Sequence, residues 1–455
     1  MKRAIKVLIF LCIVSNGVRA QQPAMQFFRP HDQSGLNIFE TNKTDTVPFS
    51  GLKVRIGGGF SQDYQSLVDK NTATYVPTNT NPSKGAIDST NANKLAPLGG
   101  GFDLGFANLS LDAQLADGIR TNITLYLASE HHEDTWVKNG YLQVDKMLFL
   151  NSDVVNDAMK FLTFQVGDLD VDYGDQHYRR ADGGNEMYNP FVENYIMDEF
   201  ATELGGEVYF HSGTGFLAMA GVTDAMLDPT VKLSSTIDAA TGQPNKYDPA
   251  FLAKLGFDRQ FNNDLRIRIT GSYYEVQSTA SSTLFGGDRT GSHYFLAMAN
   301  TESPVTSGSE DLTFTGGRFN PGFSEAVSTF MVNPFIKLCG LEFFGTYENA
   351  SGRTITESTT RNVTQMAADL IYHFGSGENF WIGARYNTVK AQLAPASAPT
   401  DVTINRIVGS IGWFLTPSVM MKGEYVSEQY NGFPTNNILN GGAFSGEMIQ
   451  AVVGF

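Results

Sequence analysis

The sequence predicts an all-β fold, a transmembrane antiparallel up-and-down β-barrel of about 16 strands with short periplasmic turns and long extracellular loops. Two observations lead to this prediction. Apolar and polar residues alternate with a period of two from Gly51 to the C-terminus, as they do in strands with one face toward lipid and the other toward a polar interior. Short turns also alternate with long polar stretches along the chain, which is typical of outer-membrane barrels.

The composition is consistent with this fold class. Of the 455 residues, 17% are charged and 46 are Gly, whereas an average soluble domain has roughly 25% charged residues and about 7% Gly. The 42% hydrophobic content also fits a globular enzyme, so the distribution of the apolar residues has to decide between the two classes. A net charge of −15 argues against nucleic acid as a partner, because phosphate binding needs clustered Lys and Arg.

The first twenty residues have the pattern of a secretory signal peptide. Lys2, Arg3 and Lys6 precede an apolar run over 7–14, and small residues near Ala20 offer a cleavage point. The apolar run is too short to cross a membrane core of about 30 Å as a helix. Without residues 1–20 the chain has 28 Lys and Arg against 47 Asp and Glu, a net charge of −19. The polar, turn-rich residues 21–50 then form an N-terminal periplasmic arm.

Residues 51–455 form the barrel. In the segment 265–270, for example, Leu, Ile and Ile alternate with Arg, Arg and Thr. The sixteen expected strands are 51–66, 101–114, 119–130, 136–149, 161–173, 203–211, 215–224, 250–259, 264–277, 324–337, 340–350, 362–374, 380–391, 402–415, 418–428 and 444–455. The segment 292–317 offers a further pair, which would raise the number of strands to eighteen. The alternation changes phase near Phe106–Ala107 and near Gly167–Asp168, where bulges would keep the apolar face toward lipid.

Connections of two lengths separate these segments. Five are short and polar: 116–118, 212–215, 261–264, 375–378 and 416–418. Seven are long and irregular: 68–98, 175–202, 224–248, 278–291, 351–360, 394–400 and 429–442. We therefore expect the short ones at the periplasmic end and the long ones at the extracellular end.

The chain ends on an aromatic residue that completes an apolar stripe. Ile449, Ala451, Val453 and Phe455 share one strand face, which would lie against lipid. Together with the signal peptide and the alternation, terminal Phe455 resembles the signature of outer-membrane proteins that the barrel-assembly machinery recognises. Barrel-assembly machinery and outer-membrane lipid are thus the expected partners.

Three longer blocks resemble a porin-like outer-membrane β-barrel family of Bacteroidota: residues 28–40, 188–198 and 340–346. The likeness to phosphate-selective porins O and P is loose and lies in architecture more than in motif. The resemblance implies a cell outer-membrane location, a pore for passive diffusion of small hydrophilic solutes or ions, and no enzymatic activity or cofactor. A homo-oligomer is compatible with it, and it does not identify the solute.

The segment 168–203 carries the strongest functional signal. Asp168, Asp170 and Asp172 alternate, so a strand would turn all three carboxylates to the lumen, since an ionised Asp is costly against lipid. Arg179 and Arg180 follow in a long loop, and a short helix is expected from Asn189-Pro190. The loop 175–202 either constricts the pore or is an ordinary extracellular loop. The three Asp residues fail the EF-hand pattern, because the sixth position is not Gly and the twelfth is not Glu, although a looser cation site fits them.

Charged residues on the polar face of the other strands should line the lumen. The expected cations are Arg120, Arg266, Arg268, Arg385, Arg406 and Lys422, and the expected anions are Asp103, Asp112, Asp369 and Glu424. On opposite walls they would create a transverse field that orients solutes, and as neighbours they would form salt bridges that rigidify the wall. The net charge of the chain favours cations over anions as permeating ions.

Two other function classes remain open at this point. The cluster 131–134, His-His-Glu-Asp, is compatible with a barrel-embedded hydrolase, although the chain has no G-x-S-x-G, H-E-x-x-H or Walker A motif and no predicted metal site. Alternatively, the chain is an envelope binding or assembly barrel without an open pore. In that case the arm 21–50 would plug the lumen or contact a periplasmic partner.

Overall fold

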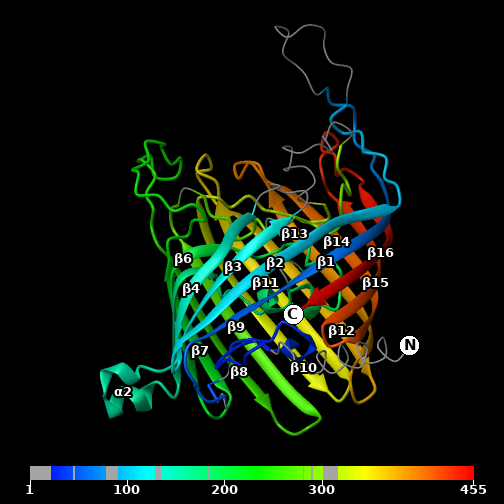
Figure 1. Ribbon diagram of the computed structural model, residues 1–455. Helices are drawn as coiled ribbons and strands as arrows, with labels where there is room; N and C mark the ends of the chain where they lie inside the picture. The colour runs from blue at the N-terminus through cyan, green and yellow to red at the C-terminus, as the bar shows by residue number, and fades with distance from the viewer. Residues whose placement is uncertain are drawn as a thin grey trace, which may run out of the picture.

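The computed structural model describes residues 22–41, 43–44, 47–77, 91–128, 135–181, 185–279, 281–287, 291–300 and 316–455. Within these ranges the chain forms a closed antiparallel barrel of sixteen strands, each paired with its neighbours in sequence, and β1 closes the ring against β16 (Figure 1). The strands are β1 (Lys53–Lys70), β2 (Gly101–Ala116), β3 (Ile119–Ala128), β4 (Thr135–Val144), β5 (Leu162–Asp170), β6 (Thr202–His211), β7 (Phe216–Thr223), β8 (Ala250–Gln260), β9 (Leu265–Val276), β10 (Ala326–Leu338), β11 (Leu341–Arg353), β12 (Arg361–Phe374), β13 (Phe380–Leu393), β14 (Thr400–Thr416), β15 (Val419–Asn431) and β16 (Ala443–Gly454).

The sixteen expected strands are confirmed, and the eighteen-strand alternative is wrong because the ring closes without a further pair. Helical turns are few in the described ranges, and all of them lie in segments before or between the strands. They are η1 (Gln33–Gly35), η3 (Leu148–Leu150), α2 (Asp153–Ala158), η4 (Gln176–Arg179) and η5 (Glu186–Tyr188). Among the described residues, no helix is long and apolar enough to span a membrane.

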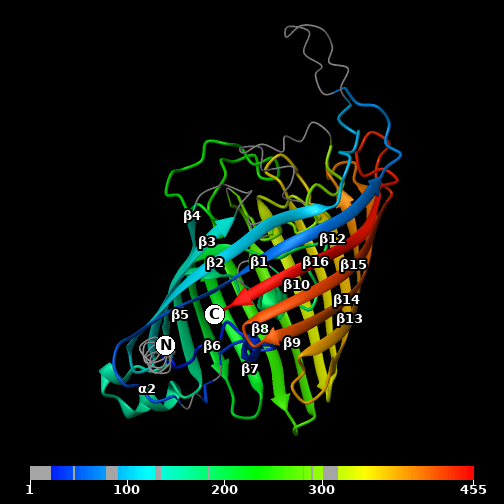
Figure 2. The same cartoon turned by 45° about the vertical axis from the view of Figure 1, so that its right-hand side comes forward.

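The two ends of the barrel differ in their connections, as the turn chemistry predicts. At one end, here called the turn end, the strands are joined by 117–118, 212–215, 261–264, 339–340, 375–379 and 417–418, together with the longer 145–161 that carries α2. At the other end, the loop end, long connections rise above the wall (Figures 1 and 2). Gly118 shows why such turns are specified, because its φ is +73° and a Cβ there would lie 2.4 Å from Lys146.

The outer face of the wall is apolar and exposed. On β14, Ile407, Ile411 and Trp413 point outward and are each more than half exposed, while Val408 and Ser410 between them are buried. Such an apolar surface is unfavourable in contact with water and favourable in contact with lipid. Aromatic rings also follow each other around the turn end: Phe161 lies 6.1 Å from Phe210, Phe216 lies 5.3 Å from Phe257, and Phe257 lies 6.2 Å from Phe261, measured between ring centroids. Such a girdle marks the edge of a membrane-spanning band.

The C-terminal stripe lies on this outer face. Ile449 and Phe455 are each nearly half exposed, whereas Gln450 and Val452 between them are buried in the interior. The backbone of Phe455 exchanges two hydrogen bonds of 3.0 Å with Gly58 of β1, which fixes the chain end to the first strand.

The two expected phase changes have different outcomes. In β2 a bulge is present, but it lies at Asp103–Gly105, just before Phe106: Gln62 pairs with Gly105 and Asp63 with Asp103. In β5 the expected bulge is wrong, because both ladders run through Gly167 without a register shift. The apolar residues therefore change sides, with Val166 facing out and Leu169 facing in. This change is tolerated because apolar residues of the following loop fill part of the lumen.

A charge on the outer face is expected to cost most at mid-height. Ile407→Arg should lower the free energy of unfolding in lipid vesicles by about 2–4 kcal/mol. Asp401→Arg, on the same face of β14 but about 20 Å nearer the loop end, should cost about 0–1 kcal/mol. Urea unfolding of both variants checks this, and equal costs would place the face outside the hydrocarbon.

Candidate functional site

The loop between β5 and β6, residues 171–201, is here called the inner loop, and its described residues, 171–181 and 185–201, lie inside the barrel. Phe191, Val192, Ile196 and Met197 are fully buried in it. The expected helix from Asn189-Pro190 is wrong, since residues 191–201 contain no helical turn. The reason is that the backbone N–H groups donate to side chains of the wall instead of to helix carbonyls. Val192 donates to Glu424 (2.7 Å), Ile196 to Asn387 (2.7 Å) and Met197 to Gln365 (3.0 Å).

Cations of the β12–β15 wall hold the carbonyls of the same loop. Arg385 forms a two-pronged pair with Asp369 (2.7 and 2.9 Å) and also donates to the carbonyl of Glu193 (2.9 Å). Lys422 donates to three carbonyls, those of Glu186, Asn189 and Phe191, at 2.9–3.1 Å. Arg385, Asp369 and Lys422 were predicted to be lumen charges, and they do face inward. Arg385 and Lys422 bind carbonyls of the loop, and Asp369 binds Arg385.

Arg406 extends this pattern. It pairs with Glu428 of β15 (2.5 Å) and donates to the carbonyls of Asn194 (2.7 Å) and Gly317. Glu424, besides holding Val192, accepts a hydrogen bond of 2.6 Å from the Tyr294 hydroxyl. The β9–β10 connection is thus also bound inside the lumen.

A second charged cluster joins the inner loop, the wall and the N-terminal arm. Arg268 donates to Asp175 of the loop (both contacts 2.8 Å) and to Glu40 of the arm (2.7 and 2.8 Å). Lys254 pairs with Asp172 and Asp175. Burial raises the pKa of Asp175, but the neighbouring Arg268 and Lys254 outweigh it, so its pKa is lowered from the ordinary value.

The remaining predicted cations are paired in the same manner. Arg179 contacts Glu342 at 2.8 Å, Arg180 contacts both carboxylate oxygens of Asp198 at 2.6 and 2.9 Å, and Arg266 contacts Asp258 at 2.7 Å. Together with the ion pairs of Arg385 and Arg406, these pairs correspond to the second of the two expectations for the lumen charges, in which neighbouring charges form salt bridges.

Several central residues carried no signal in the sequence. Glu193 accepts from Arg318 at 3.0 Å and from the His293 backbone, and although burial raises its pKa, Arg318 and neighbouring cations lower it to about 2. His293 lies 2.5 Å from Asp63; burial lowers its pKa, but Asp63 raises it to about 9. Lys254 was detectable in principle, because it is the single charge at an inward position of an otherwise apolar segment, 250–256.

Part of the N-terminal arm lies inside the turn end. Gln33 donates its backbone N–H to Pro417 (2.8 Å), and the Arg29 guanidinium lies 3.8 Å from the centroid of the Tyr188 ring. Phe39 is buried, with Phe335 and Tyr178 at centroid distances of 5.5 and 5.8 Å. These contacts join the arm to the wall and to the inner loop.

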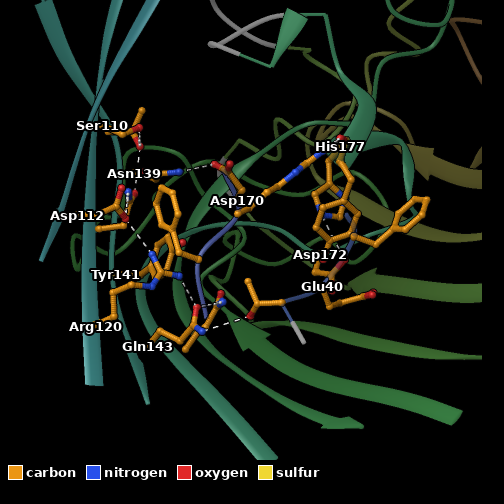
Figure 3. A pocket seen from close by; sticks show the side chains of 18 of the residues that line it. Glu40, Ser110, Asp112, Arg120, Asn139, Tyr141, Gln143, Asp170, Asp172 and His177 are labelled. Atoms are coloured by element: carbon orange, nitrogen blue, oxygen red, sulfur yellow. Dashed lines mark hydrogen bonds and ion pairs between the residues drawn. The ribbon is translucent and has the colours of Figure 1, made fainter. Parts of the chain in front are cut away.

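Open space remains mainly along the β2–β5 wall. A cavity of about 210 Å³, here called the side cavity, has this wall on one side and the inner loop with Glu40 of the arm on the other (Figure 3). Asp112, Arg120 and Asp170 line it from the strands, and Asp172 lines it from the loop. A second cavity of about 330 Å³ at the loop end shares Lys138 with it. On the opposite side, a space of about 500 Å³ at the turn end is lined by Arg266 and Asn37. Arg179 and Glu342 line a smaller pocket that shares Asn37 with it.

The expected carboxylate ladder is divided between these spaces. Asp170 lines the side cavity and accepts from Asn139 (2.9 Å), and Asp172, beyond the end of β5, pairs with Lys254. Asp168 lines the cavity at the loop end instead and lies opposite Leu204, whose side chain is exposed. The prediction that all three carboxylates share one face is therefore wrong, because alternation continues through Gly167 and puts Leu169 on the inner face.

Two predictions fall partly or wholly outside the described chain. Residues 131–134 of the His-His-Glu-Asp cluster and the side chain of Asp103 lie outside the described residues. Within the described ranges, no three His, Cys, Asp or Glu side chains come together as metal ligands.

Breaking one anchor of the inner loop should be costly. Arg385→Met leaves Asp369 buried without its ion-pair partner and frees the Glu193 carbonyl, so the free energy of unfolding should fall by about 3–5 kcal/mol. The double variant Arg385→Met/Asp369→Asn should lose less, because no charge is left unpaired. Urea unfolding in lipid vesicles, followed by Trp fluorescence, measures both. Equal losses for the single and double variants would mean that the ion pair is not the anchor.

Comparison with known proteins adds structural similarities only. No family model and no curated protein matches the chain. Among solved structures, OmpT of Vibrio cholerae, an outer membrane protein, aligns over 90% of this chain and 99% of its own at 12% identity and a TM-score of 0.48. The anion-selective porin of Comamonas acidovorans aligns over 89% and 100% at 10% identity and 0.48. The outer membrane channel DcaP of Acinetobacter baumannii aligns over 89% and 98% at 9% identity and 0.47. At this level of similarity, function has to be argued from the lumen itself.

Proposed function

We propose that this chain is an outer-membrane channel through which small hydrophilic solutes diffuse passively. One observation carries the proposal: the side cavity and the cavity at the loop end are both lined by Lys138, along the β2–β5 wall. A barrel that served only as a membrane anchor would not need a polar path beside its filling. The turn end is then periplasmic and the loop end extracellular, and residues 1–20 direct export.

The junction of the two cavities is the narrow point of the proposed route. Lys138 is the bulged residue of β4, because Thr124 pairs with Asn139 and Leu125 pairs with Val137. A bulge redirects a side chain, and here the Lys138 ammonium lies 4.6 Å from the centroid of the Phe200 ring on the inner loop. In this proposal the inner loop constricts the route, which is the role expected for residues 175–202.

A second candidate function rests on the filling of the lumen. The inner loop and the arm are both bound by buried charges, as described for Arg385 and Arg268. An envelope binding or assembly barrel without an open pore would have the same filling. Current through the purified protein separates the two candidates.

The deciding experiment is single-channel recording in planar bilayers. The intact protein should conduct, and replacing Arg179–Phe200 by a short Gly-Ser linker should raise the conductance because the lumen then fills with water. A matched control deletes 229–235, a largely exposed part of the β7–β8 connection, and should leave conductance unchanged.

Each outcome of the recording has a consequence. Absence of current from the intact protein would favour the closed envelope barrel. Unchanged conductance after the linker replacement would remove the inner loop from the pore. Reversal potentials in a salt gradient then test the cation preference that the net charge of the chain suggests.

A further inference from the structure

The wall of the side cavity differs chemically from the rest of the lumen. Inward positions on β9 and β12–β15 carry Arg, Lys, Asp and Glu that hold the inner loop and the arm. Inward positions on β2–β5 carry mostly amides and hydroxyls, among them Asn108, Ser110, Asn122, Thr124, Asn139 and Gln143. A neutral hydrogen-bonding wall that borders open space is suited to a ligand rather than to a loop.

Three of the four carboxylates that line the side cavity are neutralised by ion pairs inside the protein. Arg120 donates to Asp112 (2.9 Å) and to Gln143 (2.8 Å), as Figure 3 shows, and Asp112 also accepts from Asn122 (3.0 Å). Asp172 pairs with Lys254 and Glu40 with Arg268, while Asp170 accepts from the amide of Asn139. These ion pairs reduce the attraction of the cavity for an inorganic ion.

Two of the histidines that line the cavity, His31 and His177, add no charge at neutral pH. Burial lowers the pKa of His31 on the arm to about 4. Burial also holds the pKa of His177 on the inner loop well below its ordinary value, and Lys254 lowers it further. Both rings are consequently neutral at pH 7 and act as hydrogen-bonding groups.

Some polar atoms of the residues that line this cavity have no hydrogen-bond partner. Asp112 Oδ2 and Asn139 Oδ1 have no hydrogen-bond partner among the described residues, although their side chains are more than nine-tenths buried. The ring atom His177 Nδ1 on the facing loop is also without a partner there. Because an unsatisfied buried polar atom is costly, each of these atoms favours a hydroxyl, which both donates and accepts.

Aromatic rings complete the cavity opposite the amides. Tyr178 lies with its ring centroid 3.9 Å from that of His177, and Phe39 lies edge-on to Tyr178. Both line the space, together with Phe28 and Tyr141. A ligand that presents C–H groups on one side and hydroxyls on the other matches this division, and the volume of about 210 Å³ suits a single small ring.

We propose that the side cavity binds an uncharged polyhydroxylated solute of the size of one sugar ring. This inference rests on the proposed channel function and specifies its solute class. The amides of β2–β5 and His177 hydrogen-bond the hydroxyls, and the rings of Phe39 and Tyr178 cover the C–H face.

Calorimetric titration of the full-length protein in detergent tests the site without requiring conductance. The probes are D-glucose, D-galactose and D-mannose, with inorganic phosphate and sodium chloride as charged comparators. At least one sugar should bind, and neither salt should displace it. Tighter binding of phosphate than of every sugar would overturn the proposal.

Variants locate the site. Asn139→Leu removes the amide at nearly constant volume and should weaken sugar binding at least tenfold. Gln165→Leu, a second cavity residue, should weaken it in the same direction and keeps the test valid if Asn139→Leu does not fold. Asn362→Leu makes the same type of change on the exposed face of β12 and should leave affinity within twofold. Equal effects at Asn139 and Asn362 would overturn the assignment.

The solute inference and the channel proposal fail in different ways. A protein that conducts but binds none of the sugars would overturn the solute class and leave the channel intact. A protein that binds a sugar in detergent but carries no current would support the site and overturn the channel.

Discussion

The arrangement of this barrel depends on one constraint, that polar backbone enclosed in the lumen needs partners. Residues 191–199 of the inner loop lie in the lumen without helix or sheet hydrogen bonds of their own, and buried backbone groups left unpaired would be costly. Glu424, Asn387 and Gln365 accept from its N–H groups, while Arg385 and Lys422 donate to its carbonyls. Wall side chains thus replace secondary structure, which explains why charged residues are fully buried in a membrane barrel.

The same constraint divides the lumen into two sides. Where strands β9 and β12–β15 hold the loop and the arm, the charges of the wall are engaged with protein groups. Where strands β2–β5 carry amides and hydroxyls, the inner loop is not tied to them in the same manner, and the side cavity stays open. The polar character of the two walls therefore differs with what each wall contacts. A transverse field across open water is not needed to explain the charges at Arg268 or Asp369.

Much of the wall was predictable because its rules are local. Alternation with a period of two, turn residues and the terminal Phe455 each depend on neighbouring residues, and they located all sixteen strands and both ends. The prediction failed at Asn189-Pro190, where a local helix signal lost to distant acceptors such as Asn387. It failed again at Asp168, where the cost of a carboxylate near lipid was given more weight than the unbroken alternation that turns Leu169 inward.

By itself the sequence determined the barrel, its strand number to within one pair, and the inward direction of most of its charges. The tertiary structure alone decided which charges meet, because strands far apart in the chain, such as β9 and β14, enclose one interior only when the ring closes. Arg268 meets Glu40 across 228 residues, and no local pattern records such a distance. These pairings also bound the side cavity, which lies beside the β2–β5 wall and opposite the residues that hold the loop.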